Sequence, residues 1–245
     1  MTDERNELLD YINNSLENFF EKTAVLKESE KSSVYLYTHK DSGKKIIKRI
    51  SANRNDEVFR ALKSRNIPNL ANILEVCSAE DYLLTLEEYI EGDSLEEVIS
   101  DGILDVKTAC TYAYQLCNAL IALHKRKVIH RDIKPSNIII GDDGEAYLID
   151  LGIARMQNSE SDSDTESLGT AGYAAPEQFG IVQSNCATDI YALGIVLNKM
   201  ITGVHPSITI PQGKIGKIIE KTTSIQISKR YSDAAQFQKK LKHFI

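Results

Sequence analysis

The run His130–Asn137 constrains this chain more than any other stretch of its 245 residues. Its order, His-Arg-Asp-Ile-Lys-Pro-Ser-Asn, places a carboxylate, an ammonium and a carboxamide within one short loop. Asp150–Gly152 follows as Asp-Leu-Gly, and Ala175–Glu177 follows as Ala-Pro-Glu. A lone His-x-Asp would mean little, whereas the full set in this order is rarely matched by chance.

Together these motifs resemble the catalytic core of a eukaryotic-type serine/threonine protein kinase, in the compact form found in bacteria. The resemblance covers residues 22–243. It implies an enzyme that transfers the γ-phosphate of ATP to Ser or Thr hydroxyls of protein substrates, with Mg²⁺ as its metal and Mn²⁺ as the alternative. It also implies a bilobal fold with a small β-rich lobe and a larger, mainly helical one.

The hydrophobic pattern by itself favours an α+β protein, with strands first and helices afterwards. The expected elements are an amphipathic helix over 4–20, short β-type segments over about 23–50, a helix near 54–65, strands near 73–77 and 82–87, and a helix over 106–126. We therefore predict an N-terminal helix over 1–21 and a kinase domain over 22–245, divided into lobes at 22–90 and 91–245.

Composition narrows the class of protein further. The net charge of −6 argues against a nucleic-acid-binding surface. The four cysteines form no Cys-x-x-Cys pair, which favours reduced thiols. The sequence has no apolar run of about 18 residues that would span a membrane, and no signal peptide precedes the domain. A cytoplasmic location is expected.

Five residues are assigned to the reaction by the resemblance. Asp132 is expected to accept the proton of the acceptor hydroxyl, and Lys134 to contact the γ-phosphate. Asn137 and Asp150 are expected to bind the metal. Thr170, in a Gly-Thr-x-x-Tyr stretch, is expected to bond to Asp132 and Lys134 and to shape the acceptor pocket.

Three further residues are predicted to support the site without reacting. Glu177 and Arg230 are expected to form a buried ion pair that holds the larger lobe together. Asp189 matches the residue that anchors the backbone of the catalytic loop.

The grip on the nucleotide phosphates is predicted at Lys48, the last residue of Lys-Ile-Ile-Lys, where the family usually has Val-Ala-Ile-Lys. Lys44 and Lys45 are rivals, but the preceding apolar pair and the strand alternation favour Lys48. Its expected carboxylate partner on the next helix is Glu57, with Asp56 as the runner-up.

The stretch that matches the glycine-rich loop departs from the family pattern. Ser29 and Ser32 stand at two glycine positions, and Lys27 stands at the third. Side chains therefore occupy places where the backbone should approach phosphate closely, so weaker nucleotide binding is predicted. Two residues of the segment joining the lobes, Glu88 and Ile90, are also expected to contact ATP. Val34 and Ile139 are the remaining expected contacts.

Glu87 falls at the so-called gatekeeper position, which is usually apolar or Thr. A charged side chain facing the pocket is costly unless it is paired. Two explanations remain open: a lysine neutralises Glu87, or the alignment is shifted by one residue.

Arg131, directly before Asp132, adds a regulatory hypothesis. Kinases with this arginine often dock a phosphate from their own activation loop. Thr165 and Ser167 are the leading candidates for such self-phosphorylation, although serine-rich loops also occur simply because they are polar.

Two alternatives to an active protein kinase stay open. A pseudokinase, acting as a nucleotide- or protein-binding signalling module, would explain the missing glycines. A small-molecule phosphotransferase of related fold ranks last, because such enzymes usually lack the Gly-Thr-x-x-Tyr-x-Ala-Pro-Glu segment.

Overall fold

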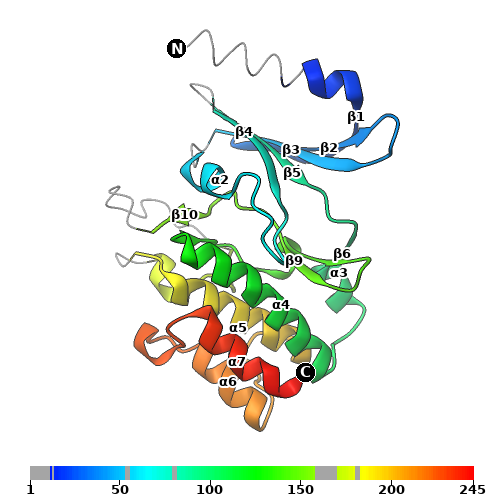
Figure 1. Ribbon diagram of the computed structural model, residues 1–245. Coiled ribbons are helices and arrows are strands. Elements are labelled where there is room, and N and C mark those ends of the chain that lie inside the picture. The colour runs from blue at the N-terminus through cyan, green and yellow to red at the C-terminus, as the bar shows by residue number, and fades with distance from the viewer. Residues whose placement is uncertain (1–11, 13, 53–55, 79–81, 158–169, 180–182) are drawn as a thin grey trace. The chain divides into compact units, whose positions relative to one another are not determined.

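The computed structural model describes residues 12, 14–52, 56–78, 82–157, 170–179 and 183–245. It consists of two compact units. The first contains Met1–Asn66 and Ala71–Ile90, and the second contains Ile67–Leu70 and Glu91–Ile245. The first unit is rich in strands and the second is mainly helical (Figure 1). This confirms the α+β class and the β-rich and helical parts that were expected.

The first unit is built on an antiparallel five-stranded sheet with the order β1-β2-β3-β5-β4. Its strands are β1 (Phe20–Glu28), β2 (Ser32–His39), β3 (Lys45–Ser51), β4 (Ile73–Ser78) and β5 (Leu83–Glu88). Gly43, with φ of 69°, lies in the turn between β2 and β3, where its missing side chain allows a left-handed backbone conformation. The short helix α2 (Asp56–Leu62) packs against β4. The elements expected near 54–65, 73–77 and 82–87 are therefore confirmed.

The register of the central strands sorts their side chains onto two faces. Residues directly opposite each other in an antiparallel pair point to the same face, and successive residues alternate. Val34 is opposite Arg49, and Arg49 is opposite Thr85. Tyr35 is opposite Lys48 on the alternate face. Lys48 and Arg49 therefore point to opposite sides of the sheet.

A helical segment precedes β1 and covers one of these faces. Residues 14–19 are helical and β1 begins at Phe20, slightly before the expected helix limit at residue 21. Leu16 is only 4% exposed and packs with Tyr37 and Ile46. Tyr37 and Ile46 are paired across β2 and β3 on the same face as Lys48. Residues 1–11 and 13 of the expected helix lie outside the described residues.

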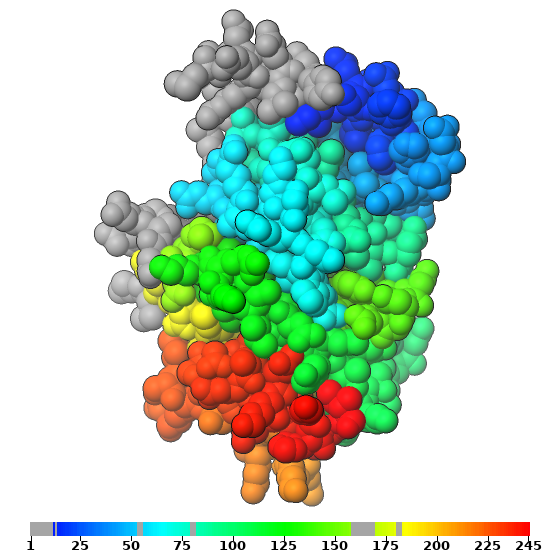
Figure 2. All heavy atoms as spheres, viewed as in Figure 1, coloured from blue at the N-terminus to red at the C-terminus, as the bar shows by residue number. Residues whose placement is uncertain are grey.

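The second unit surrounds the long helix α4. The helices are α3 (Leu95–Ser100), α4 (Val106–Lys125), α5 (Cys186–Thr202), α6 (Lys214–Thr222) and α7 (Ala234–Leu241), with 3₁₀ turns η1 (Pro135–Asn137), η2 (Pro176–Phe179), η3 (Ile227–Lys229) and η4 (Lys242–Phe244). Asp105 caps α4 by accepting hydrogen bonds from the amides of Lys107 and Thr108. The C-terminal segment (red) lies beside the green segment that contains α4 (Figure 2).

The apolar face predicted for α4 is confirmed. Its fully buried positions are Ala109, Cys110, Ala113, Leu116, Cys117, Ala119, Leu120 and Leu123. All four cysteines of the protein are free thiols. None of the helices in the described part of the chain is long and apolar enough to cross a membrane.

Short strands frame the run His130–Asn137. These are β6 (Gly92–Ser94), β7 (Val128–Ile129), β8 (Ile138–Gly141), β9 (Ala146–Leu148) and β10 (Arg155–Met156), paired as β6-β8-β9 and β7-β10. Because β7 ends before His130 and β8 starts after Asn137, both ends of the run are held by strand pairing.

The segment Ile67–Leu70 belongs to the second unit because Asn69 bonds to it on several sides. The side-chain nitrogen of Asn69 donates to the backbone carbonyl of Ala146 at 3.0 Å. The backbone carbonyl of Asn69 accepts from the Leu148 amide at 2.9 Å. Its side-chain oxygen accepts from Asn118 at 3.0 Å. Asn69 also has φ of 61°, a conformation that asparagine tolerates better than most residues.

The packing of Leu16 can be tested by truncation. Leu16→Ala should lower the free energy of unfolding by about 2–5 kcal/mol, because it leaves a cavity over Tyr37 and Ile46. Phe19→Ala is the matched control, since Phe19 is 58% exposed, and it should change stability by about 0.5 kcal/mol or less. Urea denaturation measures both. Equal effects of the two changes would show that the helix does not pack on the sheet.

Candidate active site

One buried carboxylate anchors the backbone at the start of the run His130–Asn137. Asp189, on α5, is completely buried. Its two oxygens accept hydrogen bonds from the backbone amides of His130 and Arg131, at 3.0 and 2.9 Å. Arg131 adopts φ of 71°, a strained conformation for a side-chain-bearing residue, and this amide contact helps to maintain it. The anchoring contact predicted for Asp189 is present.

His124, which the sequence analysis did not single out, balances the charge of Asp189. Its Nε2 lies 2.8 Å from an Asp189 oxygen. Burial by itself would raise the pKa of Asp189, but the hydrogen bond with His124 outweighs it, so that pKa is below its usual value. Burial likewise would lower the pKa of His124, but the contacts with Asp189 and with Cys186 raise it to about 9. Both groups are therefore charged at neutral pH.

Asp132, Lys134 and Thr170 form a closed triangle of contacts. The Lys134 ammonium lies 2.8 Å from Asp132 Oδ2 and donates to the Thr170 hydroxyl at 2.8 Å. That hydroxyl in turn donates to Asp132 Oδ1 at 2.8 Å. The structure thus brings together the three residues that were predicted to bond here, with an ammonium and a carboxylate held by a common hydroxyl.

The two predicted metal ligands lie on neighbouring pieces of backbone. Asn137 donates its amide nitrogen to the carbonyl and to Oδ2 of Asp132, both at 2.9 Å. Its own backbone carbonyl accepts from the amide of Ile149, the residue before Asp150. Asp150 has φ of 64°, and its Oδ1 accepts from the Gly152 amide. A carboxamide oxygen and a carboxylate are hard oxygen donors of the kind that Mg²⁺ prefers.

The end of the activation segment is tied to the catalytic loop by Gln178, a residue that the sequence analysis missed. Its side-chain oxygen accepts from the Ala175 amide, and its nitrogen donates to the Arg131 carbonyl, both at 2.9 Å. Gln178 is only 2% exposed. One buried carboxamide therefore links the Ala-Pro-Glu motif to the residue beside Asp132.

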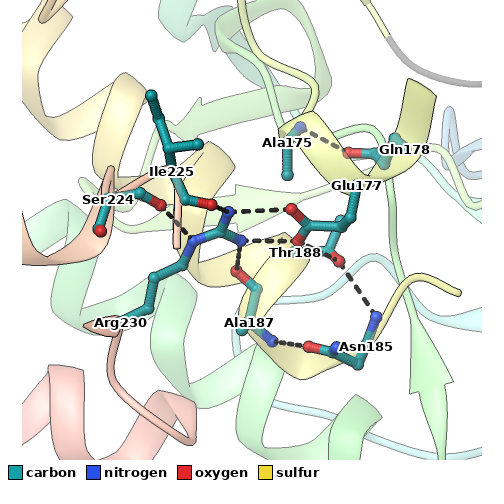
Figure 3. Close-up of polar contacts among 9 residues, drawn as sticks. All are labelled: Ala175, Glu177, Gln178, Asn185, Ala187, Thr188, Ser224, Ile225 and Arg230. Atoms are coloured by element: carbon teal, nitrogen blue, oxygen red, sulfur yellow. Dashed lines mark hydrogen bonds and ion pairs between the residues drawn. The ribbon is translucent and has the colours of Figure 1, made fainter. Parts of the chain in front are cut away.

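The predicted ion pair between Glu177 and Arg230 is present and bidentate (Figure 3). The two guanidinium nitrogens donate to the two carboxylate oxygens at 2.6 and 2.9 Å. Burial would raise the pKa of Glu177, but Arg230 outweighs this and keeps the pKa low. The Thr188 hydroxyl also donates to Glu177, and Arg230 reaches the carbonyls of Ser224 and Ala187. This network joins the start of α5 to the loop that precedes α7.

In the first unit, Lys48 lies on the face that Leu16 covers. It is 8% exposed, and its ammonium sits 5.5 Å from the centre of the Tyr37 ring. Burial lowers the pKa of Lys48; the charge of Glu17 opposes this shift and that of Lys22 adds to it. The surroundings of Lys48 thus include the N-terminal segment.

The predicted partner of Lys48, Glu57, is exposed on α2. None of the ion pairs found among the described residues includes Glu57. The runner-up, Asp56, accepts hydrogen bonds from Arg60 and Ser78, both at 3.3 Å. The buried residues of α2 are apolar: Val58, Phe59 and Leu62.

The charge at Glu87 is neutralised by Arg49. Arg49 Nε donates to Glu87 Oε1 at 3.0 Å, and the Thr85 hydroxyl donates to the same oxygen at 2.6 Å. Both charged side chains are more than nine-tenths buried. The expected alternatives at Glu87 were a lysine partner or a shifted alignment, and the structure provides an arginine instead.

The remaining predicted nucleotide contacts are distributed over both units. Ser29 closes the β1–β2 turn, with its hydroxyl donating to the Ser32 carbonyl at 2.9 Å and accepting from the Ser32 amide at 3.1 Å. A serine hydroxyl therefore shapes a turn where the family has glycine. The Glu88 carboxylate accepts from the amide of Asn72. Val34 and Ile90 lie in the first unit and Ile139 in the second; Thr165 and Ser167 lie outside the described residues.

A small hollow lies beside Arg131 within the second unit. The lining residues are Ile129, Arg131, Arg155, Met156, Gln157, Gln183 and Ser184. Two arginines at one hollow suit an anionic group such as a phosphate.

Comparison with known proteins places this geometry in a family. The protein kinase domain model matches residues 20–245. The chain belongs to the protein kinase family. Its tied Asp132, Lys134 and Thr170, with the Glu177–Arg230 pair, are thus features of a kinase domain in which Arg49 and Glu87 form an additional buried pair.

Several curated kinases are similar to this kinase domain. A probable serine/threonine-protein kinase of Clostridium perfringens is 36% identical over 161 residues, which cover 62% of this chain and 24% of that protein. Serine/threonine-protein kinase PrkC of Bacillus subtilis is 35% identical, covering 66% of this chain and 26% of PrkC. A probable serine/threonine-protein kinase of Dictyostelium discoideum is 34% identical, covering 71% and 37%. The matches thus span between 24% and 37% of these relatives' lengths.

Removing the charge of Glu177 should destabilise the second unit strongly. Glu177→Gln leaves the Arg230 guanidinium buried without its counter-charge, which typically costs about 3–5 kcal/mol. Glu220→Gln on the exposed side of α6 is the matched control and should be nearly neutral. Urea unfolding of both variants gives the comparison. A loss no larger at Glu177 than at Glu220 would rule out the supporting role.

The raised pKa of His124 predicts a specific pH dependence of stability. A group whose pKa is higher in the folded state stabilises fully below its unfolded pKa of about 6.5 and loses this contribution as pH rises through the folded value, here about 9. The free energy of unfolding should therefore fall between pH 7 and pH 9.5 more steeply in the parent than in His124→Gln. Thermal or urea unfolding across this range tests it. Parallel curves would contradict the charged His124–Asp189 pair.

Proposed function

We propose that this protein is a serine/threonine kinase that transfers the γ-phosphate of ATP to hydroxyls of protein substrates. The observation that carries the proposal is the triangle of Asp132, Lys134 and Thr170, in which one hydroxyl bonds to both charged groups. It gives a base and a cation in fixed positions a few ångströms apart, which is the arrangement that phosphoryl transfer requires. The serine/threonine names of the relatives support the choice of acceptor.

Each residue of the triangle has a role in the reaction. The acceptor hydroxyl approaches Asp132, which orients its oxygen and takes its proton as that oxygen bonds to the γ-phosphorus. The bond between the γ-phosphorus and the oxygen bridging to the β-phosphate breaks, and ADP leaves with that oxygen. Lys134 stabilises the negative charge on the transferred group. Thr170 keeps Asp132 and Lys134 aligned and forms one side of the acceptor pocket.

Asn137 and Asp150 fit a hard divalent cation. The amide nitrogen of Asn137 is used on Asp132, so its oxygen is the atom left for a metal. Mg²⁺, or Mn²⁺ in its place, would neutralise phosphate charge when bound here. Ile149 links the two ligands through its hydrogen bonds to Asn137 and His130, so that both ligands depend on the same stretch of backbone.

Our proposed contacts to adenosine are Val34, Glu88, Ile90 and Ile139. The turn formed by Ser29 and Ser32 is our proposed phosphate-binding loop. The Ser32 hydroxyl is buried and has no hydrogen-bond partner among the described residues. Affinity for ATP is still expected to be weaker than with glycines, since the serine side chains limit how closely backbone amides approach.

Regulation by self-phosphorylation is part of the proposal. The hollow beside Arg131 also has Arg155 on its wall, and two guanidinium groups suit a phosphate carried by the activation segment. Thr165 and Ser167 are the proposed phosphate carriers. A cytoplasmic location remains our expectation, because the four cysteines are free thiols and form no Cys-x-x-Cys pair. Neither the comparisons nor the described residues favour a binding module without catalysis.

The role of Asp132 can be tested directly. Asp132→Asn keeps the size of the side chain and removes its basicity, so phosphate transfer from radiolabelled ATP to a generic protein acceptor should fall by ~10²–10⁴-fold. Binding of Mg-ATP, measured by calorimetry, should persist. Asp142→Asn, at an exposed position, is the control and should leave transfer unchanged. Transfer by Asp132→Asn at the parent's rate would refute the proposed function.

A further inference from the structure

Two neighbouring cations on β3 compete for one role. Kinase chemistry needs a positive side chain on this strand to hold the α- and β-phosphates of ATP. Lys48 and Arg49 are adjacent, so only one of them can point to the nucleotide side of the sheet. We propose that Arg49, held by Glu87, is the residue that binds these phosphates, and that Lys48 is a structural residue of the opposite face. This inference rests on the proposed kinase function and names a binding residue within it.

The face of Lys48 is already covered by protein. Its ammonium lies against Tyr37, which packs with Leu16 and Ile46. The charged groups that affect its pKa are Glu17 in the N-terminal helical segment and Lys22 on β1. A nucleotide on this side of the sheet would have to displace the helical residues 14–19. Lys48 is therefore poorly placed to meet a triphosphate.

The face of Arg49 carries the residues expected at a nucleotide. Arg49 is directly opposite Val34 on β2, which is a predicted contact to adenosine. On its other side it is opposite Thr85, and Glu87 at the gatekeeper position lies two residues along the same face. If Val34 and Glu87 border the nucleotide, strand alternation requires that Arg49 borders it as well.

The position of the acidic partner supports the same assignment. A buried cation in this place needs a carboxylate to hold it. The buried residues of α2 are all apolar, so that helix does not supply the acid from its buried side. Glu87 on β5 supplies it, with its carboxylate also fixed by the Thr85 hydroxyl. A carboxylate that would be unfavourable at the gatekeeper position alone becomes half of a balanced pair.

An arginine changes the chemistry of the phosphate contact. Its guanidinium stays protonated at every physiological pH and can bind two phosphate oxygens at once. Glu87 engages Nε, and this fixes the plane of the group. Lysine at the same place would present a single mobile ammonium. Arg49→Lys is therefore expected to restore only part of the affinity lost in Arg49→Met.

The test compares Arg49→Met with Lys48→Met. Binding of Mg-ATP is measured by calorimetry, and transfer to a generic protein acceptor is measured in parallel. Arg49→Met should raise the Kd for Mg-ATP by about tenfold or more and should lower kcat/KM further. Lys48→Met should change the Kd by less than about threefold, with its effect appearing in thermal stability instead. Lys107→Met, an exposed change on α4, is the neutral control.

A second variant covers the case in which Arg49→Met fails to fold because Glu87 is left unpaired. Arg49→Met/Glu87→Gln removes both charges and retains the hydrogen bond from Thr85, and it should show the same loss of Mg-ATP binding. Loss of binding in Lys48→Met with normal binding in the arginine variants would overturn the inference, and so would equal losses in both. A parent protein that neither binds Mg-ATP nor transfers phosphate would overturn the proposed function itself.

Discussion

The site in the second unit depends on one buried carboxylate. Asp189 holds two successive backbone amides, those of His130 and Arg131, from a fully buried position on α5. A charge in such a place is tolerated because His124 lies against it and two amide dipoles point at it. This contact stabilises the strained backbone conformation of Arg131. The conformation of Arg131 then sets the direction in which the chain continues to Asp132.

The acceptor side is tied to the same anchor by polar links from a different part of the chain. Gln178 bonds to the Arg131 carbonyl, and its neighbour Glu177 is clamped by Arg230. Thr170 then reaches back to Asp132 and Lys134. Loops are usually the least rigid parts of a protein, but here each loop is bonded to another or to α5. The reacting groups can therefore keep their spacing without a bound substrate.

The sequence allowed much of this site to be predicted, because its motifs are contiguous and each carries its own geometry. Asp132, Lys134 and Thr170 lie together, and Glu177 pairs with Arg230. Gln178 and His124 were missed because neither lies within the motifs that carried the resemblance: Gln178 follows Ala-Pro-Glu directly, and His124 lies six residues before His130. The rivals of Lys48 that the sequence suggested were Lys44 and Lys45, and Arg49 as a phosphate-binding residue could not be recognised from β3 alone. That assignment depends on the register with β2 and β5 and on the N-terminal helix that covers one face.

The packing of Leu16 also bears on where this kinase domain begins. The family match starts at residue 20, yet Leu16 lies ahead of it and shields Tyr37 and Ile46. A polypeptide trimmed to the matched region would expose Tyr37 and Ile46 to water on the face of the sheet that Leu16 covers. Such a patch favours self-association. In physical terms, the folding unit is longer than the region that the family model matches.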